Sequence, residues 1–299
     1  MSRWKLIFVV SLLCEQTGAA DWDAKTSPGP QRPVALAVLP EGDMVLVANQ
    51  RAGTVITVNY VQGVIERRWG PFGLLQDLDL LPPRHAVVAV AEPPQLVAID
   101  LDAAESDAWR TRHLSHRPSA ICVSGDGARV AVTSRSDRLV TVITTKGLHA
   151  TDGETATKDA TVSLPFQPGR CLWLPDQRHL LVADAYGGKL AVLDAAAETV
   201  DSVRAIPAHN IAALALGRGG ERVFLTHQAI HGGAHTSRED VHWGGILTNV
   251  LRSLAVRDLV DPAADALKHN VTVHLGDIGR AAGDPAGVAV RADGLTVVA

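Results

Sequence analysis

The sequence predicts an all-β fold built from a repeated unit of four short strands. Residues 33–49 contain two Val-rich apolar runs joined by a turn with Gly and Asp, and residues 118–134 align with them without gaps. Short apolar runs that end at Gly, Asp and Pro are typical of strands, whereas helices show a 3.6-residue period. Further copies begin at residues 75, 168, 211 and 285. A period of about 40–45 residues is the length of one four-stranded blade of a β-propeller.

The first unit indicates where the four strands of a blade begin and end. We expect strands at residues 34–38, 44–48, 54–58 and 64–69. Gly42 lies in the turn after the first strand, where it supplies the positive φ that such turns need. One blade cannot bury both of its faces alone, so the blades must stack and share a continuous apolar layer.

The repeat predicts five complete blades and a sixth that is cut short within its second strand. The β-propeller is therefore expected over residues 33–299, incomplete at its C-terminus. An unpaired strand edge promotes aggregation, so we expect the sequence to be part of a longer protein. An open ring is the alternative.

The N-terminus has the features of an export signal. Arg3 and Lys5 precede a short apolar core at residues 6–13, and small residues at 18–20 suit cleavage. We therefore expect a signal peptide at 1–20, a linker at 21–32, and a periplasmic or extracellular protein. The apolar core is too short to span a bilayer, so no transmembrane span is expected in the mature chain. The alternatives are a buried N-terminal strand and a lipoprotein anchored through Cys14.

Composition narrows the choice of partners and cofactors. The net charge is −4 and no run of Lys or Arg is present, which argues against a nucleic-acid partner. No Cys-x-x-Cys-His motif occurs, so this segment attaches no c-type haem. Cys122 and Cys171 fall on the first strands of neighbouring blades. They are expected to be buried thiols, and a disulfide across the two blades is the alternative.

The fifth unit is the irregular one, because the next copy starts only at residue 285. The surplus follows the second strand, and we place an insertion at residues 227–270. Apolar residues at 247, 250, 251 and 254 have helical spacing, and Thr236-Ser237 resembles a helix-capping box. The sequence therefore predicts a helical insertion in the fifth blade, with a second short helix at 258–268.

The insertion also gathers histidines and an acidic residue that suit a metal. Imidazole binds copper, zinc and iron, and a carboxylate can complete such a site. Candidate divalent metals are copper, zinc and calcium. The alternatives are histidines that make ordinary hydrogen bonds and a site for an anionic ligand. The predicted metal ligands are His227, His231, His235, Asp240 and His242.

Polar residues also recur at one end of the blades. The loops before each first strand and after each second strand share the face that holds the mouth of the central channel, and insertions often lie on the binding face. These residues are expected to bind a ligand there, or else to be solvated turn residues. They are Arg32, Asn49, Arg117, Arg170, Asp184, His209, Asn210 and Asp284.

Residues 47–55 (Val-Ala-Asn-Gln-Arg-Ala-Gly-Thr-Val) and 182–194 resemble the YVTN-repeat β-propeller family. The resemblance implies a seven-bladed, extracytoplasmic fold. The family also includes lactonase-like enzymes that hold a divalent cation with Glu, Asn and Asp. Asn49, Asp184 and Asn210 match such positions here, but no Glu stands convincingly among them, and Glu92 in the second unit is a substitute that nothing else supports.

The sequence favours a binding or scaffold module that presents its channel mouth to a small ligand, a protein partner or a fused C-terminal domain. No Ser-His-Asp order and no nucleophile elbow is visible. The alternatives are the propeller part of a periplasmic redox enzyme or a metal-dependent lactonase-like hydrolase. The redox alternative follows from segments 226–228 and 240–244, which resemble propellers fused to cytochrome c or di-haem peroxidase domains.

Overall fold

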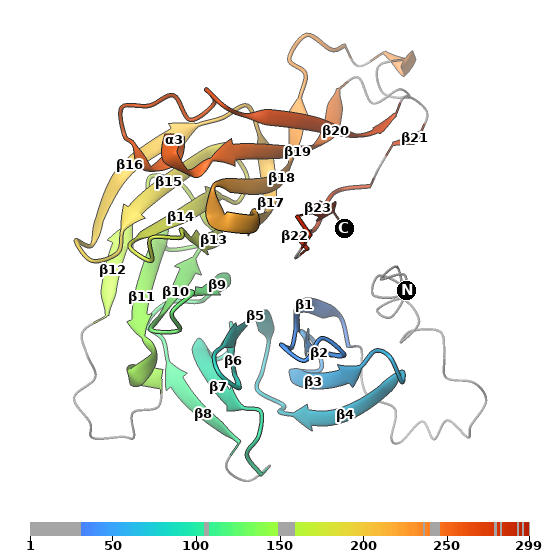
Figure 1. Cartoon of the computed structure of the whole chain (residues 1–299), viewed down its shortest axis with the longest axis vertical. Helices are drawn as coiled ribbons and strands as arrows, with labels where there is room; N and C mark the ends of the chain where they lie inside the picture. Colours follow the sequence, from blue (N-terminus) through green and yellow to red (C-terminus); the bar gives the residue numbers. More distant parts are fainter. Residues whose placement is uncertain are drawn as a thin grey trace. The chain divides into compact units, whose positions relative to one another are not determined.

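The computed structural model shows an all-β chain, drawn in Figure 1. Described residues are 31–104, 108–148, 159–235, 237–239, 246–277, 280–281, 283–291, 293–294 and 296–298. The predicted signal peptide and most of the linker lie outside this set. The chain divides into two compact units, Met1–Val123 with Thr144–Thr157, and Ser124–Ile143 with Lys158–Ala299. Each unit is described by itself.

The first unit contains two four-stranded antiparallel sheets in simple up-and-down order. The strands of the first blade are β1 (Pro33–Val38), β2 (Met44–Asn49), β3 (Thr54–Asn59) and β4 (Val64–Trp69). Those of the second are β5 (Leu75–Leu81), β6 (His85–Val90), β7 (Gln95–Asp100) and β8 (Trp109–His113). Strand β9 (Ala120–Val123) and the 3₁₀ turn η2 (Thr145–Leu148) also belong to this unit. The strand bounds predicted for the first blade are confirmed to within one residue.

The second unit contains the later blades. Its first strands in the chain are β10 (Arg129–Ser134), β11 (Leu139–Thr144) and β12 (Ala160–Ser163), which form one sheet. The fourth blade is β13 (Pro168–Trp173), β14 (His179–Asp184), β15 (Lys189–Asp194) and β16 (Thr199–Ala205). The fifth is β17 (His209–Leu216), β18 (Arg222–Ile230), β19 (Leu247–Ala255) and β20 (Val271–Asp277), with β21 (Arg280–Ala281) at its edge. β22 (Val288–Val290) and β23 (Thr296–Val298) pair as the start of a sixth blade, as predicted.

The burial of each strand depends on its place in the blade. Strand β3 is buried along its whole length, whereas the outer strands β4 and β16 alternate or are mostly exposed. In the first unit, Leu46 and Val55 share one apolar cluster with Val88 of the second blade. In the second unit, Leu181 and Leu190 pack in the same way with Leu225. Neighbouring blades therefore bury their inner strands from both sides, as β-propeller packing requires.

The turn between the second and third strands explains the motif that carries the family resemblance. In the first blade, the carbonyl of Gly53 accepts the N–H of Phe72 at 2.8 Å. In the fourth blade, Gly188 accepts the N–H of Ile206 at the same distance. A Cβ on Gly188 would lie 2.2 Å from the Ile206 carbonyl oxygen. Glycine is thus required because the loop after the fourth strand packs directly on this turn.

The predicted helical insertion in the fifth blade is wrong in its main part. Residues 247–254 form strand β19, which pairs with β18 over nine positions from Arg222↔Ala255 to Ile230↔Leu247. The apolar spacing looked helical because β19 is buried on both faces, so apolar residues need not alternate. Only α3 (Val256–Val260) is helical in the region of the expected second helix, followed by turns to Lys268.

Two further observations concern the cysteines and the membrane. Cys122 and Cys171 are buried and neither forms a disulfide, so the prediction of buried thiols is confirmed. In the described part of the chain, no helix has the length and hydropathy that crossing a bilayer requires.

Candidate functional site

The candidate site lies at one end of the fifth blade. Strand β17 begins there, and the hairpin of β18 and β19 extends past it. Asn210 has φ 48°, a left-handed conformation that Asn tolerates better than most residues. Its N–H donates to the carbonyl of Tyr186 at 3.2 Å. Its side-chain Nδ2 donates to Oε1 of Gln228 at 2.5 Å. The backbone conformation therefore aims the Asn210 amide at the second strand of its own blade.

Gln228 connects two residues that the sequence predicted to bind a ligand. Its Oε1 accepts from Asn210, and its Nε2 donates to Oδ1 of Asp284 at 2.7 Å. Asn249 lies opposite Gln228 in β19 and donates from Nδ2 to the carbonyl of Gly283 at 2.9 Å. The loop that precedes β22 is thereby fastened to the fifth blade. Asn210 and Asp284 remain exposed beside the buried Gln228 amide.

His227 is fully buried, and both of its ring nitrogens are engaged. Nε2 lies 3.2 Å from Nε of Arg252. Because a guanidinium only donates, Nε2 must accept, and Nδ1 must then donate to the Gln228 carbonyl at 2.9 Å. Burial lowers the pKa of His227 below its usual value, and the charge of Arg252 lowers this pKa further, against the opposing backbone hydrogen bond. His227 is therefore held neutral, and a metal could bind only by displacing Arg252.

Arg252 itself is an unusual buried group. The residue is only 6% exposed. Its Nη1 donates to Oδ1 of Asn270 at 3.0 Å and its Nη2 to the carbonyl of Pro207 at 3.4 Å. These acceptors, like His227, are neutral, and no described carboxylate forms an ion pair with it. Burial lowers the pKa of Arg252, but an arginine in a protein stays charged.

The predicted metal ligands are not gathered within the described residues. His231 is exposed, with Nε2 3.0 Å from the Thr248 hydroxyl, and His235 is exposed further along the hairpin. Asp240 and His242 lie outside the described residues. In the part of the chain that is described, three metal-ligating groups meet only elsewhere, in the fourth blade. The set as a whole stays a prediction.

The other predicted ligand-binding residues already have local partners. In the first unit, Asn49 is buried and donates to the Thr54 hydroxyl at 3.4 Å, and Arg117 forms an ion pair with Glu92 at 3.0 Å. Arg32 is exposed, and its carbonyl accepts from Gln50.

In the second unit, Arg170 donates from Nε to the Ala212 carbonyl at 3.0 Å. Asp184 is buried and accepts the N–H of Tyr186 at 3.1 Å. Of the predicted residues, Asn210 and Asp284 contact Gln228, while His227 contacts Arg252 on the other face of β18. His209 begins β17, next to Asn210.

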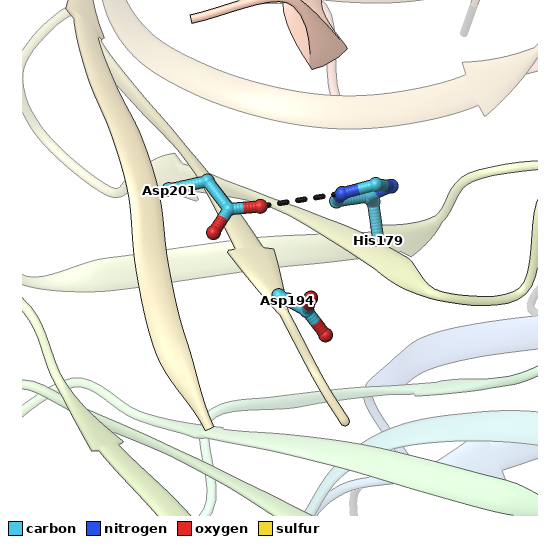
Figure 2. Close-up of side chains that lie close together, drawn as sticks. All are labelled: His179, Asp194 and Asp201. Carbon is cyan, nitrogen blue, oxygen red and sulfur yellow. Dashed lines mark ion pairs between the residues drawn. The ribbon is translucent and has the colours of Figure 1, made fainter. Parts of the chain in front are cut away.

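Figure 2 shows the group of His179, Asp194 and Asp201 in the fourth blade. Their ligand atoms lie within 4.8 Å of one another. His179 Nε2 is 3.2 Å from Asp201, and its Nδ1 is 2.5 Å from Asp176. Arg178 donates from Nε to Oδ2 of Asp194 at 2.7 Å, and this contact lowers the pKa of Asp194. A cation would have to displace the guanidinium from that oxygen.

The same arrangement recurs in another blade, which indicates a structural role. Oδ1 of Asp194 accepts the N–H groups of Ala196 and Ala197 in the turn after β15. In the second blade, Oδ1 of Asp100 accepts from the two equivalent N–H groups after β7, and His85 pairs with Asp100 as His179 pairs with Asp194. We therefore assign the group in Figure 2 to turn formation and surface ion pairing.

Comparison with solved structures identifies the class of fold. Hydrazine synthase of Kuenenia stuttgartiensis aligns with TM-score 0.73 and 17% identity over 93% of this chain and 75% of that one. The β-propeller domain of Cps50 (Swd1) from Myceliophteria thermophila gives 0.63 and 14% over 89% and 79%. A chain of a mitotic checkpoint complex gives 0.62 and 11% over 89% and 74%. No family model and no curated protein matches the sequence. The protein is a β-propeller, and these likenesses show the fold alone.

Proposed function

We propose that the protein is an extracytoplasmic β-propeller binding module of YVTN type, with its ligand-binding surface at the fifth-blade end described above. The observation that carries the proposal is the hydrogen-bonded series Asn210–Gln228–Asp284. The buried amide of Gln228 holds the exposed amide of Asn210 and the exposed carboxylate of Asp284 in place. Pre-organised polar groups of this kind give orientation and specificity in ligand sites. The occupant is a small ligand, a protein partner or a fused C-terminal domain.

The chemistry of the cluster favours recognition over catalysis. A general base needs a lone pair that can take a proton near the working pH and reach the substrate. The one buried histidine of the cluster, His227, has its Nε2 lone pair engaged by Arg252. Asn210 and Gln228 do not titrate, and Asp284 already accepts from Gln228.

The experiment is a thermal-shift screen of polar metabolites on the full chain, followed by calorimetry on two variants. Asn210→Gly removes the amide but keeps the left-handed backbone, because glycine adopts positive φ without strain. Glu198→Gly is the matched control, since Glu198 has φ 57° and is exposed in the turn between β15 and β16. We expect Asn210→Gly alone to weaken binding by about ten-fold, which is one strong hydrogen bond. If Asn210→Gly and Glu198→Gly bind the ligand equally well, the ligand does not bind at this surface.

The extracytoplasmic part of the proposal has its own measurement. Fractionation of the source cells should place the protein outside the cytoplasm, and mass spectrometry should give a mature N-terminus near Asp21. A mature chain that begins at Met1 or Ser2 would overturn this part and leave the binding surface untouched.

An enzyme of redox or lactonase type is the second candidate. It is favoured by segments 226–228 and 240–244, which resemble propellers fused to haem domains, and by Asn49, Asp184 and Asn210, which match lactonase-like positions. A redox fusion would require a Cys-x-x-Cys-His motif in sequence that continues beyond Ala299. A lactonase-like enzyme would require one tightly bound divalent cation per chain, which elemental analysis of the purified protein measures directly.

A further inference from the structure

Among the described residues, no carboxylate forms an ion pair with Arg252. Transfer of an unpaired charge out of water is costly, and buried charges in proteins are usually paired or bound to a ligand. Arg222 provides a contrast within the same blade. Its acceptors among the described residues, on Ser253 and His269, are also neutral, but Arg222 is half-buried and keeps contact with water. Arg252, at 6% exposure, does not have that compensation.

All four strands of the blade contribute a basic side chain to the same region. His227 on β18 and His274 on β20 lie in one row of the sheet, because both pair with Val250. Arg252 is two positions along β19 from that row. His209 at the start of β17 and His274 are exposed, and both lie close enough for their charges to lower the pKa of His227. The region therefore combines the permanent charge of Arg252 with the exposed imidazoles of His209 and His274.

We propose that this region is an oxyanion subsite, in which Arg252 with His209 and His274 receives the carboxylate or phosphate group of a small ligand. The inference rests on the proposed function, because His227 and Gln228 are consecutive residues of β18 and place the subsite and the Asn210–Gln228–Asp284 series on opposite faces of the same strand. Guanidinium matches carboxylate and phosphate oxygens in geometry as well as charge. His227 acts as a positioning residue, since its Nε2 holds the guanidinium through Nε.

The hydrogen-bonding pattern supports an anion and disfavours a cation. Arg252 has five N–H donors, and three acceptors on His227, Asn270 and Pro207 take one each, so two donors have no acceptor among the described residues. The lone pair of His227 is not available to a metal. A cation would also face the Arg252 charge at short range and low dielectric.

A structural role is the alternative for Arg252, because its three contacts join β19 to His227 of β18, to the loop before β17 and to Asn270. The two roles predict opposite effects of Arg252→Met in buffer without oxyanions. If Arg252 serves a ligand, removal of an uncompensated buried charge leaves the melting temperature unchanged or raised. If Arg252 has a structural role, the loss of three hydrogen bonds lowers the melting temperature.

The test uses the full chain with inorganic phosphate and acetate as probes, against sodium chloride at matched ionic strength. Phosphate and acetate should each raise the melting temperature of the wild type above the chloride control, because a ligand that binds only the native state stabilises it. By calorimetry, Arg252→Met should bind at least ten-fold more weakly, and Arg252→Lys should retain part of the affinity. The matched control Arg222→Met should bind like the wild type. Preference for phosphate or for acetate identifies which oxyanion the subsite takes.

His209→Ala and His274→Ala change exposed residues that the fold does not need, so they keep the test valid if Arg252→Met fails to fold. Each should weaken oxyanion binding by several-fold. Equal melting temperatures of the wild type in phosphate, acetate and chloride would overturn the subsite. Unchanged binding in both histidine variants and in Arg252→Lys would also overturn it. If oxyanions do not bind but a ligand still binds in an Asn210-dependent way, only the oxyanion subsite is rejected. If oxyanions bind but no ligand binding depends on Asn210, the binding module is rejected and the oxyanion subsite is retained.

Discussion

Oδ2 of Asp79 in β5 accepts the backbone N–H of Val123 in β9 at 2.8 Å, across 44 residues of sequence. Two positions earlier, Asp77 makes the equivalent contact with the N–H of Ile121. Both acceptors lie on the first strand of one blade, and both donors lie on the first strand of the next. In the first unit, acidic side chains thus satisfy backbone groups along a strand edge that would otherwise lack partners.

The Asp79 contact predicts a pH dependence of stability. Burial raises the pKa of Asp79 to about 6, against the lowering effect of its backbone hydrogen bonds. Because the folded-state pKa exceeds the unfolded value, the stabilising contribution is complete at low pH and is lost as pH rises through about 6. Asp79→Asn keeps an acceptor for Val123 without the charge. It should raise the free energy of unfolding at pH 7 by about 1–3 kcal/mol and flatten the profile between pH 4 and 7, measured by urea unfolding. An unchanged profile would contradict this account.

His227 should act in the opposite direction. Its pKa is lowered in the folded state, so it contributes stability above its ordinary pKa of about 6.5, and this contribution is lost as the pH falls below that value. His227→Gln keeps an acceptor for Arg252 and should abolish this acid-side loss. His227→Ala leaves the guanidinium without that acceptor and should cost about 2–4 kcal/mol. The free energy of unfolding of both variants, measured over the same pH series, separates the effect of His227 protonation from the effect of lost packing.

Gly188→Ala tests the turn that packs against the following loop. The new Cβ would lie 2.2 Å from the Ile206 carbonyl oxygen and 2.5 Å from that of Ala208, and neither backbone group can move cheaply. We expect a loss of about 2–4 kcal/mol in the free energy of unfolding. Gly232→Ala is the control, because nothing lies within 4 Å of its Cβ and it should stay within about 0.5 kcal/mol of the wild type. Equal stabilities would refute the close approach.

The group in Figure 2 should prove structural. Asp194→Ala removes the acceptor of two turn N–H groups and should cost about 1–2 kcal/mol. His179→Ala breaks only partly exposed ion pairs and should cost less than about 1 kcal/mol. Calorimetric titration with Zn²⁺ should give the same result for wild type and His179→Ala. A zinc affinity that disappears in His179→Ala would contradict the structural assignment.

The sequence predicts the blades well because their signals are local. Strand bounds, the Gly42 turn and the paired strands of the sixth copy follow from composition along a single segment. The helix expected at residues 247–254 fails because a strand buried on both faces loses its two-residue alternation. Gln228 and Arg252 escape notice for another reason. Their hydrogen bonds depend on which residues lie opposite them in the neighbouring strands. The sequence of one strand does not determine its register with the next, so these contacts could not be predicted. A polar residue inside the apolar run of β19 was the one signal that could have pointed to Arg252.

The glycine that ends the turn between second and third strands separates two kinds of position. At Gly53 and Gly188, backbone atoms of the next loop leave no space for a Cβ, so no other residue fits there. The residues two positions earlier do not share this restriction: Arg51 and Tyr186 are exposed, and Tyr186 is 56% exposed. Sequence diversity introduced at those positions would alter the rim of a blade without disturbing its anchor. Each of these blades therefore offers a surface position at which the residue can be varied to change what the rim contacts.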